Sequence, residues 1–420
     1  MLIILNLAVI FMVYVDKKIY KTFLTPFTVV ALTFLLMIDL NNLFISDIYG
    51  YYKVSDFSIL VLLGFIAVVF AVACLFGYFW YAPKCRVAVK PKFDIEKRIN
   101  YKFVIIIFLI GLAAYFISLL RDINAYGFGN LKGKASGIFA HLSQLAFLIA
   151  PLLWSHSKSI KSKIISFCLI ALTFFMAFLY GGKYGILINF VYIMMYMLIR
   201  KDSNVKRILK YIAVIGLAGL GVFIVVYAVI PSFTSSGADN SSSLAFSIEH
   251  FFYYLMSPII ANNHCFTHPN ASDSNIPFTV IINIGKALSG DKNYVNPIFG
   301  PDFACGQDRV TNVSGLFGEV VYCLGWGGIL YIIVIFALIY IIFVMFKLKG
   351  MYKLTLSYLL SSLLFSFFCN FYTVSGVVLP IMFLFAFETY FQLIRRKSDA
   401  KRVSDNNAKL ERLAGHDRMS

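Results

Sequence analysis

The chain has 420 residues, of which 60% are hydrophobic and only 14% are charged, and its mean hydropathy is +0.81. No water-soluble domain buries that much apolar surface, so the composition excludes a soluble protein and predicts an all-α polytopic integral membrane protein. The formal net charge of +17 would suit nucleic-acid binding, but membrane proteins also gather Lys and Arg in the loops on one side of the bilayer.

Eleven apolar runs are each roughly as long as a membrane-spanning helix. We predict one membrane domain over residues 1–394 and a mobile basic cytoplasmic tail over 395–420. The first run has 14 residues, the length of a signal-peptide core, but it lacks a basic segment before it and a small-residue cleavage site after it, so we predict a helix. The predicted spans are 2–15, 22–46, 56–82, 103–120, 137–154, 164–180, 184–199, 211–230, 313–346, 354–370 and 371–394.

The connections between these spans carry unequal numbers of basic residues. Alternate connections hold 29 of the 37 Lys and Arg residues, and the opposite set holds eight. Because cytoplasmic loops carry the excess of Lys and Arg, we predict an outer N-terminus and a cytoplasmic C-terminus, and the charge no longer argues for nucleic acid. The predicted cytoplasmic segments are 16–21, 83–102, 155–163, 200–210, 347–353 and 395–420.

Three of the eight outer basic residues lie near the end of the fourth span. Arg121 ends that span, and the Gly-rich stretch FGNLKGKASG at 128–137 contains Lys132 and Lys134. Cations at a membrane surface can bind the phosphates of a lipid-linked substrate. Lys132 and Lys134 could equally be solvated loop residues, and the pattern favours that reading for these two.

The stretch FLYGGKYGILINF at 178–190 turns the chain back between two spans. Gly181 and Gly182 would let a ligand approach the backbone closely, and Lys183 would supply a positive charge at the outer edge of the membrane. The same lysine could instead extend its ammonium group to the interface and serve only the hairpin. The residues leave both readings open.

One outer connection, residues 231–312, is far longer than the others. Its first part, 231–243, is polar and turn-rich, and the apolar, aromatic segment LAFSIEHFFYYLMSPII at 244–260 follows. Because this segment is short for a span, is interrupted by Pro258 and must leave the chain outside, we predict an interfacial or re-entrant helix. Glu249 and His250 within it are candidate catalytic residues.

The long connection also holds two cysteines and a pair of histidines. Cys265 and Cys305 could form a disulfide in an oxidising compartment, or they could be free thiols with unrelated neighbours. His264 and His268 have the spacing of metal ligands on one helical turn. Pro269 and the nearby Asn residues argue against a stable helix there, so we predict solvated loop histidines and no metal site.

The stretch 300–331 is the densest group of candidate residues. Asp308 and Arg309 precede a predicted helix, and Asn312 or Ser314 could cap it. Glu319 lies inside that helix among apolar neighbours, where a carboxylate is costly unless it is paired or functional. It is our first candidate for a general base, although a hydrogen bond between helices would also explain it.

The number of predicted helices, with one large outer loop before the last few, resembles the architecture of bacterial O-antigen (oligosaccharide repeat-unit) polymerases of the Wzy type. Two local stretches add to the resemblance. YGGKYG is similar to the family's Gly-Gly-basic turn, with Lys183 where an arginine is usual, and TNVSGLFGEVVYCLGWGG is similar to its Asn-x-Ser/Thr element followed by a Gly-rich turn.

This resemblance implies a membrane glycosyltransferase with a GT-C-like fold in the bacterial inner membrane, its active site facing the periplasm. The donor would be a growing glycan on undecaprenyl pyrophosphate and the acceptor the next lipid-linked repeat unit, with no cofactor and with a chain-length regulator as a further partner. We assign the pyrophosphate to the cations and to nearby polar or glycine residues, and proton transfer to the acids and a histidine. The binding set is Lys183, Arg309, Arg121, Lys132, Lys134, Gly181, Gly182 and Asn312, and the catalytic set is Glu319, Asp308, Glu249 and His250.

Two other functions stay open. An O-antigen ligase would use the same donor, with His250, His264 or His268 as its catalytic histidine. A lipid-linked oligosaccharide flippase is a rival of another class, but transporters commonly show internal repeats and charged residues in the middle of several helices, and the sequence offers little of either.

Overall fold

The computed structural model describes residues 1–85, 93–127, 131, 137–180, 183–200, 205–225, 244–291, 293–295 and 302–394. Within these ranges, nine helices are long and apolar enough to cross a membrane. The predicted all-α multi-pass class is therefore confirmed at the level of fold. The predicted tail and the polar segment 231–243 lie outside the described residues.

Eight of the nine long helices coincide with predicted spans, and the ninth is α12 (Leu244–Thr267). Three other predicted spans are helical but are not among the nine. Of these, α1 (Leu2–Tyr20) carries three charges near its end. The other two are shorter than the nine long helices: the described part of α9 (Lys183–Arg200), and α16 (Lys353–Leu364). The exact number of spans stays a prediction.

Several helices begin where a polar side chain can accept a backbone hydrogen bond. Thr25 accepts from the N–H of Thr28, and Pro26 follows at the first helical position, where its missing N–H costs nothing. Ser55, Asn100 and Ser159 cap later helices in the same way. The four helices are α2 (Pro26–Leu40), α4 (Asp56–Leu75), α6 (Tyr101–Tyr126) and α8 (Ile160–Leu179).

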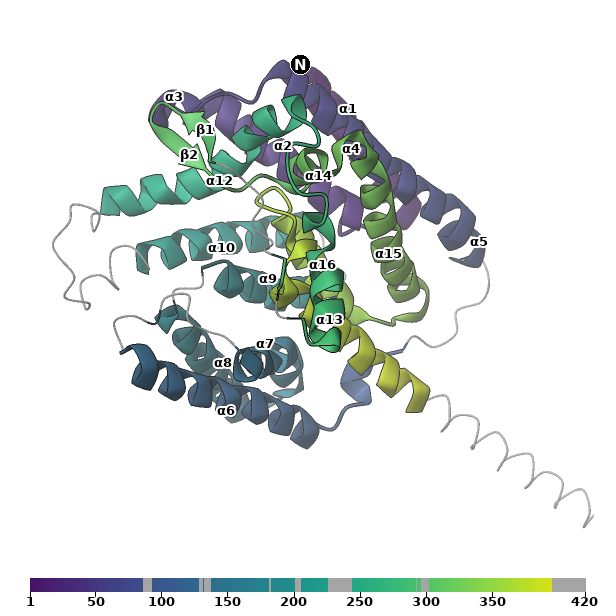
Figure 1. The fold of residues 1–420 in the computed structure, drawn as a ribbon. Coiled ribbons are helices and arrows are strands. Elements are labelled where there is room, and N and C mark those ends of the chain that lie inside the picture. Colours follow the sequence, from purple (N-terminus) through teal and green to yellow (C-terminus); the bar gives the residue numbers. More distant parts are fainter. Residues whose placement is uncertain are drawn as a thin grey trace, which may run out of the picture.

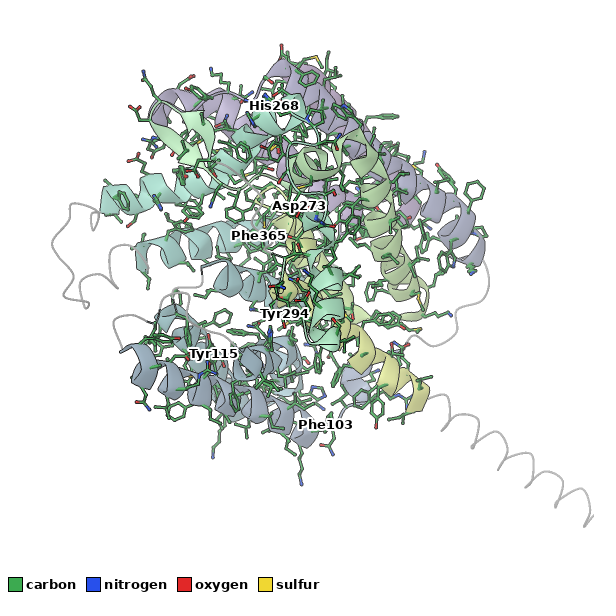
Figure 2. The ribbon with its side chains drawn as sticks, viewed as in Figure 1. Phe103, Tyr115, His268, Asp273, Tyr294 and Phe365 are labelled. Carbon is green, nitrogen blue, oxygen red and sulfur yellow. The ribbon has the colours of Figure 1, made fainter. Side chains whose placement is uncertain are left out.

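The helices form two groups that meet along the middle of the molecule (Figure 1). One core joins α1, α2, α4, α12, α14 (Leu316–Leu324) and α15 (Gly328–Lys349). The other group contains α6, α7 (Gly137–His156) and α8, and α9 packs against both α7 and α16. Tyr115 and Phe103 of α6 lie at the opposite end of the molecule from His268, which follows α12 (Figure 2).

The remaining elements are short or connect the groups. A helix over Ser375–Ile394 ends the described chain. A two-stranded antiparallel hairpin, β1 (Phe303–Gly306) and β2 (Arg309–Thr311), lies beside α12 and was not predicted. The other helices are α3 (Ser46–Tyr49), α5 (Ala82–Cys85), α10 (Val205–Ile224) and α13 (Thr279–Ser289), with short π or 3₁₀ turns at Asn41–Ile45, Phe76–Tyr81, Ile95–Lys97, Ile276–Phe278, Gly325–Gly327 and Phe371–Thr373.

Helix α12 corrects one prediction, because Pro258 does not interrupt it and the helix does not end at residue 260. It continues to Thr267, and a proline inside a helix removes one backbone hydrogen bond. The segment from Met256 to Asn262 is buried against α2, α4 and α14, and this packing keeps the helix continuous. His264 is therefore on a helix, and its ring stacks on that of His268 with centroids 4.1 Å apart.

The connections predicted to be cytoplasmic contact one another. The N–H of Phe93 donates to the carbonyl of Lys349 at 2.7 Å, and a ring nitrogen of His156 lies 3.1 Å from the carbonyl oxygen of Ile99. Arg200 and Lys353 both pair with Glu96, at 2.9 and 3.2 Å. Four of the six predicted cytoplasmic segments thus meet in one place.

The predicted outer connections form a second set of contacts. The N-terminal amine lies 3.6 Å from a carboxylate oxygen of Asp56, and the amide of Asn263 donates to the carbonyl of Lys53 at 3.0 Å. The N–H of Tyr52 donates to the carbonyl of Cys305, also at 3.0 Å. The contacts divide the connections as the predicted topology does, and which set faces the cytoplasm stays a prediction.

Candidate functional site

The β1–β2 hairpin holds Arg309 against the connection between α3 and α4. Gln307 and Asp308 form its tip, and Asp308 has a left-handed φ of 56°, which Asp tolerates better than most residues. Gly306 forms an isolated antiparallel bridge with Tyr51. Asp308 is exposed at this turn.

Arg309, Glu249 and Tyr51 form a cluster, which we call the Arg309 cluster. Its arginine and carboxylate are half-exposed and its tyrosine is buried. Arg309 Nη2 donates to Glu249 Oε1, and Nη1 donates to the Tyr51 hydroxyl oxygen at 2.9 Å. The guanidinium carbon also lies 4.9 Å from the centre of the Tyr51 ring. The Arg309 and Glu249 side chains are 31% and 38% exposed, so a ligand can reach both.

Protonation in the Arg309 cluster follows from these contacts. Burial lowers the pKa of Arg309, but Tyr51 and Glu249 outweigh this effect and raise the pKa above its ordinary value. Burial raises the pKa of Tyr51 to about 12, although Arg309 acts in the opposite direction. At neutral pH the cluster therefore contains a fixed guanidinium and a protonated phenol, and the half-exposed guanidinium can donate hydrogen bonds to an anion or a sugar hydroxyl.

Aromatic rings extend the Arg309 cluster along α12. The ring of His250 lies 5.0 to 5.4 Å from the rings of Phe246, Tyr253 and Tyr254. The Tyr253 hydroxyl donates to the carbonyl of Val310 on β2, which fixes the hairpin to the helix. Glu249 of α12 thus contacts Arg309, and Asn263 near the end of the helix contacts the connection between α3 and α4. The interfacial placement of α12 stays a prediction, since α12 is also among the helices long and apolar enough to cross a membrane.

Glu319 lies in a separate, enclosed site between α12, α14 and the segment after α16. Its side chain is only 2% exposed, and its Oε2 accepts from the N–H of Asn370 at 3.2 Å. Among the described residues, Glu319 Oε1, both amide atoms of Asn262 and the hydroxyl of Ser366 are buried without a hydrogen-bond partner. Unpaired buried polar groups are rare and costly, so this enclosed polar site is a second functional candidate.

Gly318 is what lets α14 come so close to α12. A Cβ at this position would lie 2.0 Å from Asn262 Oδ1 and 2.9 Å from Ser314 Oγ. The helix begins at Leu316 with Gly315 as N-cap and no side-chain cap, so the predicted capping by Asn312 or Ser314 is wrong. The backbone N–H of Leu316 instead donates to the carbonyl of Ser366 at 2.7 Å. Asn312 is exposed.

Arg121 belongs to a third group, far from the hairpin. Its guanidinium lies 2.8 Å from Asp122, and the Tyr180 hydroxyl donates to the same carboxylate at 2.8 Å. This contact brings the end of α6 to the end of α8, next to the predicted Gly-Gly-Lys turn. Arg121 and Arg309 lie on elements at opposite ends of the view in Figure 1, so the structure does not bring these two predicted cations into one site.

Other predicted site residues lie outside the described part of the chain: Gly181, Gly182, Lys132, Lys134 and the side chain of Lys183. Cys265 and Cys305 are free and buried, so the possible disulfide is not formed. They belong to different packing clusters, since Cys305 is in the main core and faces the Arg309 carbonyl, whereas Cys265 packs with Phe303 and Tyr322.

Sequence reasoning missed several residues of these sites. Tyr51, Asn262 and Asn370 were not singled out, because nothing in their neighbourhood along the chain marks a partner 50 or more positions away. Asp122 could have been predicted, since an acid that directly follows Arg121 at the end of a span indicates an ion pair. Another buried acid, Glu388, accepts from the N–H groups of Leu354 and Thr355 at the start of α16.

The fold defines a class of protein, a multi-pass membrane protein built from apolar helices. The chain matches no protein-family model, and neither a curated protein nor a solved structure matches it. Any more specific function must therefore be argued from the sites described above.

Proposed function

We propose that the chain is an O-antigen (polysaccharide) polymerase of the bacterial inner membrane. It transfers a growing glycan from undecaprenyl pyrophosphate to the next lipid-linked repeat unit on the periplasmic side. The observation that carries the proposal is the Arg309 cluster, where a half-exposed arginine and carboxylate, backed by the buried Tyr51, adjoin an aromatic helix face. Arginine suits a pyrophosphate, and aromatic rings with polar groups suit a sugar.

The resting ion pair suggests how the reaction begins. A donor pyrophosphate that binds Arg309 competes with Glu249 for the guanidinium and releases that carboxylate. Glu249 then accepts the proton of the acceptor hydroxyl, while the oxygen of that hydroxyl attacks the anomeric carbon of the donor. The bond from that carbon to the pyrophosphate oxygen breaks, and Arg309 stabilises the departing negative charge.

Glu319 takes a different part in this proposal. Because it is enclosed, it does not touch the substrate in the described conformation, and it holds the backbone of Asn370 beside α14. It acts as a positioning residue for the segment between α16 and the last helix. The other proposed participants are the membrane lipid, a chain-length regulator and the Gly-Gly-Lys turn at Lys183.

The proposal is tested by lipopolysaccharide ladder gels from cells deleted for the gene and complemented with variants. Deletion should leave core plus one repeat unit, and the wild-type chain should restore the ladder. Arg309→Gln and Glu249→Gln should each shorten or abolish the ladder at normal protein level, and Lys183→Ala tests the predicted turn. Lys53→Ala is the matched control, because Lys53 is an exposed outer cation that pairs with Asp47.

Two outcomes would contradict the polymerase. A deletion strain that carries no glycan on the core would point to a ligase or a flippase. If the Arg309→Gln variant and the Glu249→Gln variant each restore the full ladder, the Arg309 cluster does not take part in the reaction.

A lipid-linked oligosaccharide transporter is the second candidate, because one observation favours it. The chain has two broken helical segments, one at Gly325–Gly327 and one between α16 and the helix that starts at Ser375. Glu319 lies on α14 just before the first break and accepts a hydrogen bond from Asn370 in the second, while its Oε1 has no partner among the described residues. Broken helices around a buried acid are common at transport sites. The same gels separate the two functions, since loss of a flippase leaves no repeat unit on the core.

A further inference from the structure

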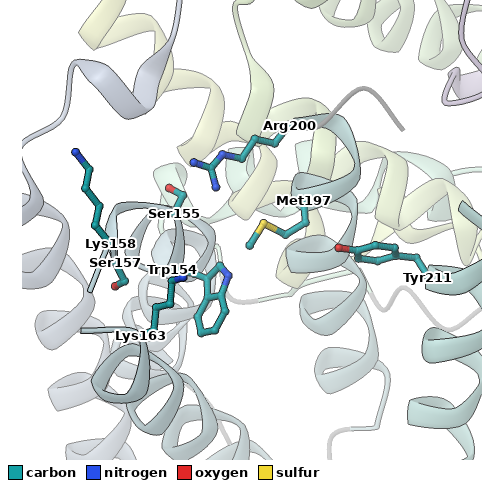
Figure 3. Close-up of a pocket in the computed structure, with 8 residues that line it drawn as sticks. All are labelled: Trp154, Ser155, Ser157, Lys158, Lys163, Met197, Arg200 and Tyr211. Carbon is teal, nitrogen blue, oxygen red and sulfur yellow. The ribbon is translucent and has the colours of Figure 1, made fainter. Parts of the chain in front are cut away.

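A cavity of about 450 Å³ lies where α7, α8, α9 and α10 meet (Figure 3). Its basic lining residues, Lys158, Lys163 and Arg200, belong to two segments of the predicted cytoplasmic set. The cavity is separate from the sites described above. Its lining includes two aromatic side chains, a methionine and three basic side chains: Trp154, Tyr211, Met197, Lys158, Lys163 and Arg200.

The charge of this cavity is positive. None of the described residues that line it is acidic. Arg200 forms an ion pair with Glu96, which does not line the cavity. Glu96 lies 2.9 Å from Arg200 Nη2 and also binds Lys353 and the Tyr196 hydroxyl. One end of the guanidinium is thereby anchored, and its remaining N–H groups can serve a ligand.

The hydrogen-bonding groups select an anion. Ser155 and Ser157 donate their hydroxyl protons to the carbonyls of Leu152 and Leu153. Figure 3 shows the Arg200 guanidinium above Trp154, the Tyr211 hydroxyl directed toward the same residue, and the Lys163 side chain beside the Trp154 ring. The donors that face the cavity therefore come mainly from cations, as a phosphate requires.

The surroundings select a lipid as the source of that phosphate. The cavity adjoins α8 and α10, whose apolar windows are the least buried of the nine candidate spans, at 22% and 17%. Ile160 and Ile164 on α8 are 79% and 58% exposed, and Leu209 and Ile212 on α10 are 59% and 48% exposed. Acyl chains can cover these side chains while Trp and Tyr lie at the level of the head groups.

We propose that this cavity binds the phosphate head group of an anionic phospholipid from the predicted cytoplasmic leaflet. The phosphate lies between Lys163 and Arg200 with Lys158 nearby, and the acyl chains follow the exposed faces of α8 and α10. Basic pockets between membrane helices on the cytoplasmic side recognise lipids in this way. The inference is independent of the proposed function.

The test uses the full-length protein in a neutral detergent and counts bound lipids by native mass spectrometry. The probes are phosphatidylglycerol, phosphatidylcholine and soluble glycerol 3-phosphate. The variant is Lys158→Gln/Lys163→Gln, and the matched control is Lys161→Gln/Lys210→Gln, which removes two exposed charges from the same region outside the cavity lining. A second variant, Met197→Trp, fills the cavity without changing its charge.

We expect wild type to bind phosphatidylglycerol saturably and at least tenfold more tightly than phosphatidylcholine. The cavity variant should lose about tenfold in affinity and the control less than twofold, and Met197→Trp should match the cavity variant. Equal losses in the two double variants, or unchanged binding by Met197→Trp, would overturn the site. If glycerol 3-phosphate competes with equal affinity, the ligand is a soluble phosphate and the proposal of a lipid ligand is wrong.

Discussion

At the scale of single residues, Glu96 shows how one carboxylate can join several elements. Its Oε1 accepts from the Tyr196 hydroxyl at 2.7 Å and from Lys353 at 3.2 Å, and its Oε2 pairs with Arg200 at 2.9 Å. Burial by itself raises the pKa of Glu96, but these three partners outweigh it and hold the pKa below its ordinary value. The folded state therefore favours the charged form of Glu96.

This pKa sets the sign of a pH effect on stability. A carboxyl whose pKa is lower in the folded chain stabilises the fold above its unfolded pKa of about 4.3, and the effect is lost as the pH falls through the folded value. Glu96→Gln should cost about 2 kcal/mol near pH 7 and nothing at the lowest pH. Thermal unfolding in detergent from pH 7 to pH 3 measures the difference between the two chains.

Asp47→Asn is the control for the pH experiment, because Asp47 pairs with Lys53 at the exposed surface. Exposed pairs contribute less than about 1 kcal/mol. If Glu96→Gln unfolds at the same temperature as wild type at pH 7, the Glu96 contacts do not stabilise the chain.

The cysteines give a second prediction at this scale. Burial raises the pKa of the Cys305 thiol to about 11, so little reactive thiolate exists at neutral pH. Maleimide should label the exposed Cys85 in the folded protein, and Cys265 and Cys305 only after unfolding. Unfolding without a reductant should expose all seven thiols of the chain. Five labelled thiols that rise to seven with reductant would establish a disulfide instead.

At the scale of elements, the contact of α12 with α14 depends on the absence of a side chain at Gly318. Gly318→Ala should destabilise the protein by about 1–3 kcal/mol, because the new methyl group overlaps the Asn262 amide. Asn262→Ala in the same chain should restore most of the loss, since this amide has no hydrogen-bond partner among the described residues. Thermal unfolding of the single and double variants measures the coupling.

Gly327→Ala is the matched control for this pair, since no described atom lies within 4 Å of a Cβ at Gly327. Its effect should stay below about 0.5 kcal/mol. Additive effects of Gly318→Ala and Asn262→Ala would mean that the two residues do not share the space.

The elements also show what the sequence could predict. Apolar runs located eight of the nine long helices, because burial in lipid requires a nearly continuous apolar segment. The continuation of α12 through Pro258 could not be read locally, since it depends on packing by α2, α4 and α14. The β hairpin was missed because its strands have four and three residues, and the Arg309–Glu249 pair joins positions 60 apart.

At the scale of the whole molecule, the two sets of connections make a prediction about sidedness. Single cysteines introduced at Lys53 and Asp308 should react with a membrane-impermeant maleimide added outside spheroplasts. Cysteines at Lys158 and Lys97 should react only after the membrane is opened, because the predicted cytoplasmic set contains both positions. These variants need a background without the native cysteines. Labelling of the cysteines at positions 158 and 53 from the same side of the membrane would contradict the predicted topology.

The cluster around Glu96 has a consequence for mechanism at the same scale. It links η3 (Ile95–Lys97) to α9 and α16, and the Phe93–Lys349 hydrogen bond adds α15, so both groups of helices are tied at one face. A carrier that works by alternating access must part its two bundles at each face in turn and would break these bonds in every cycle. An enzyme that takes both substrates from one leaflet can keep that face closed throughout. A disulfide between cysteines at 96 and 353 would therefore arrest a carrier and leave a polymerase turning over.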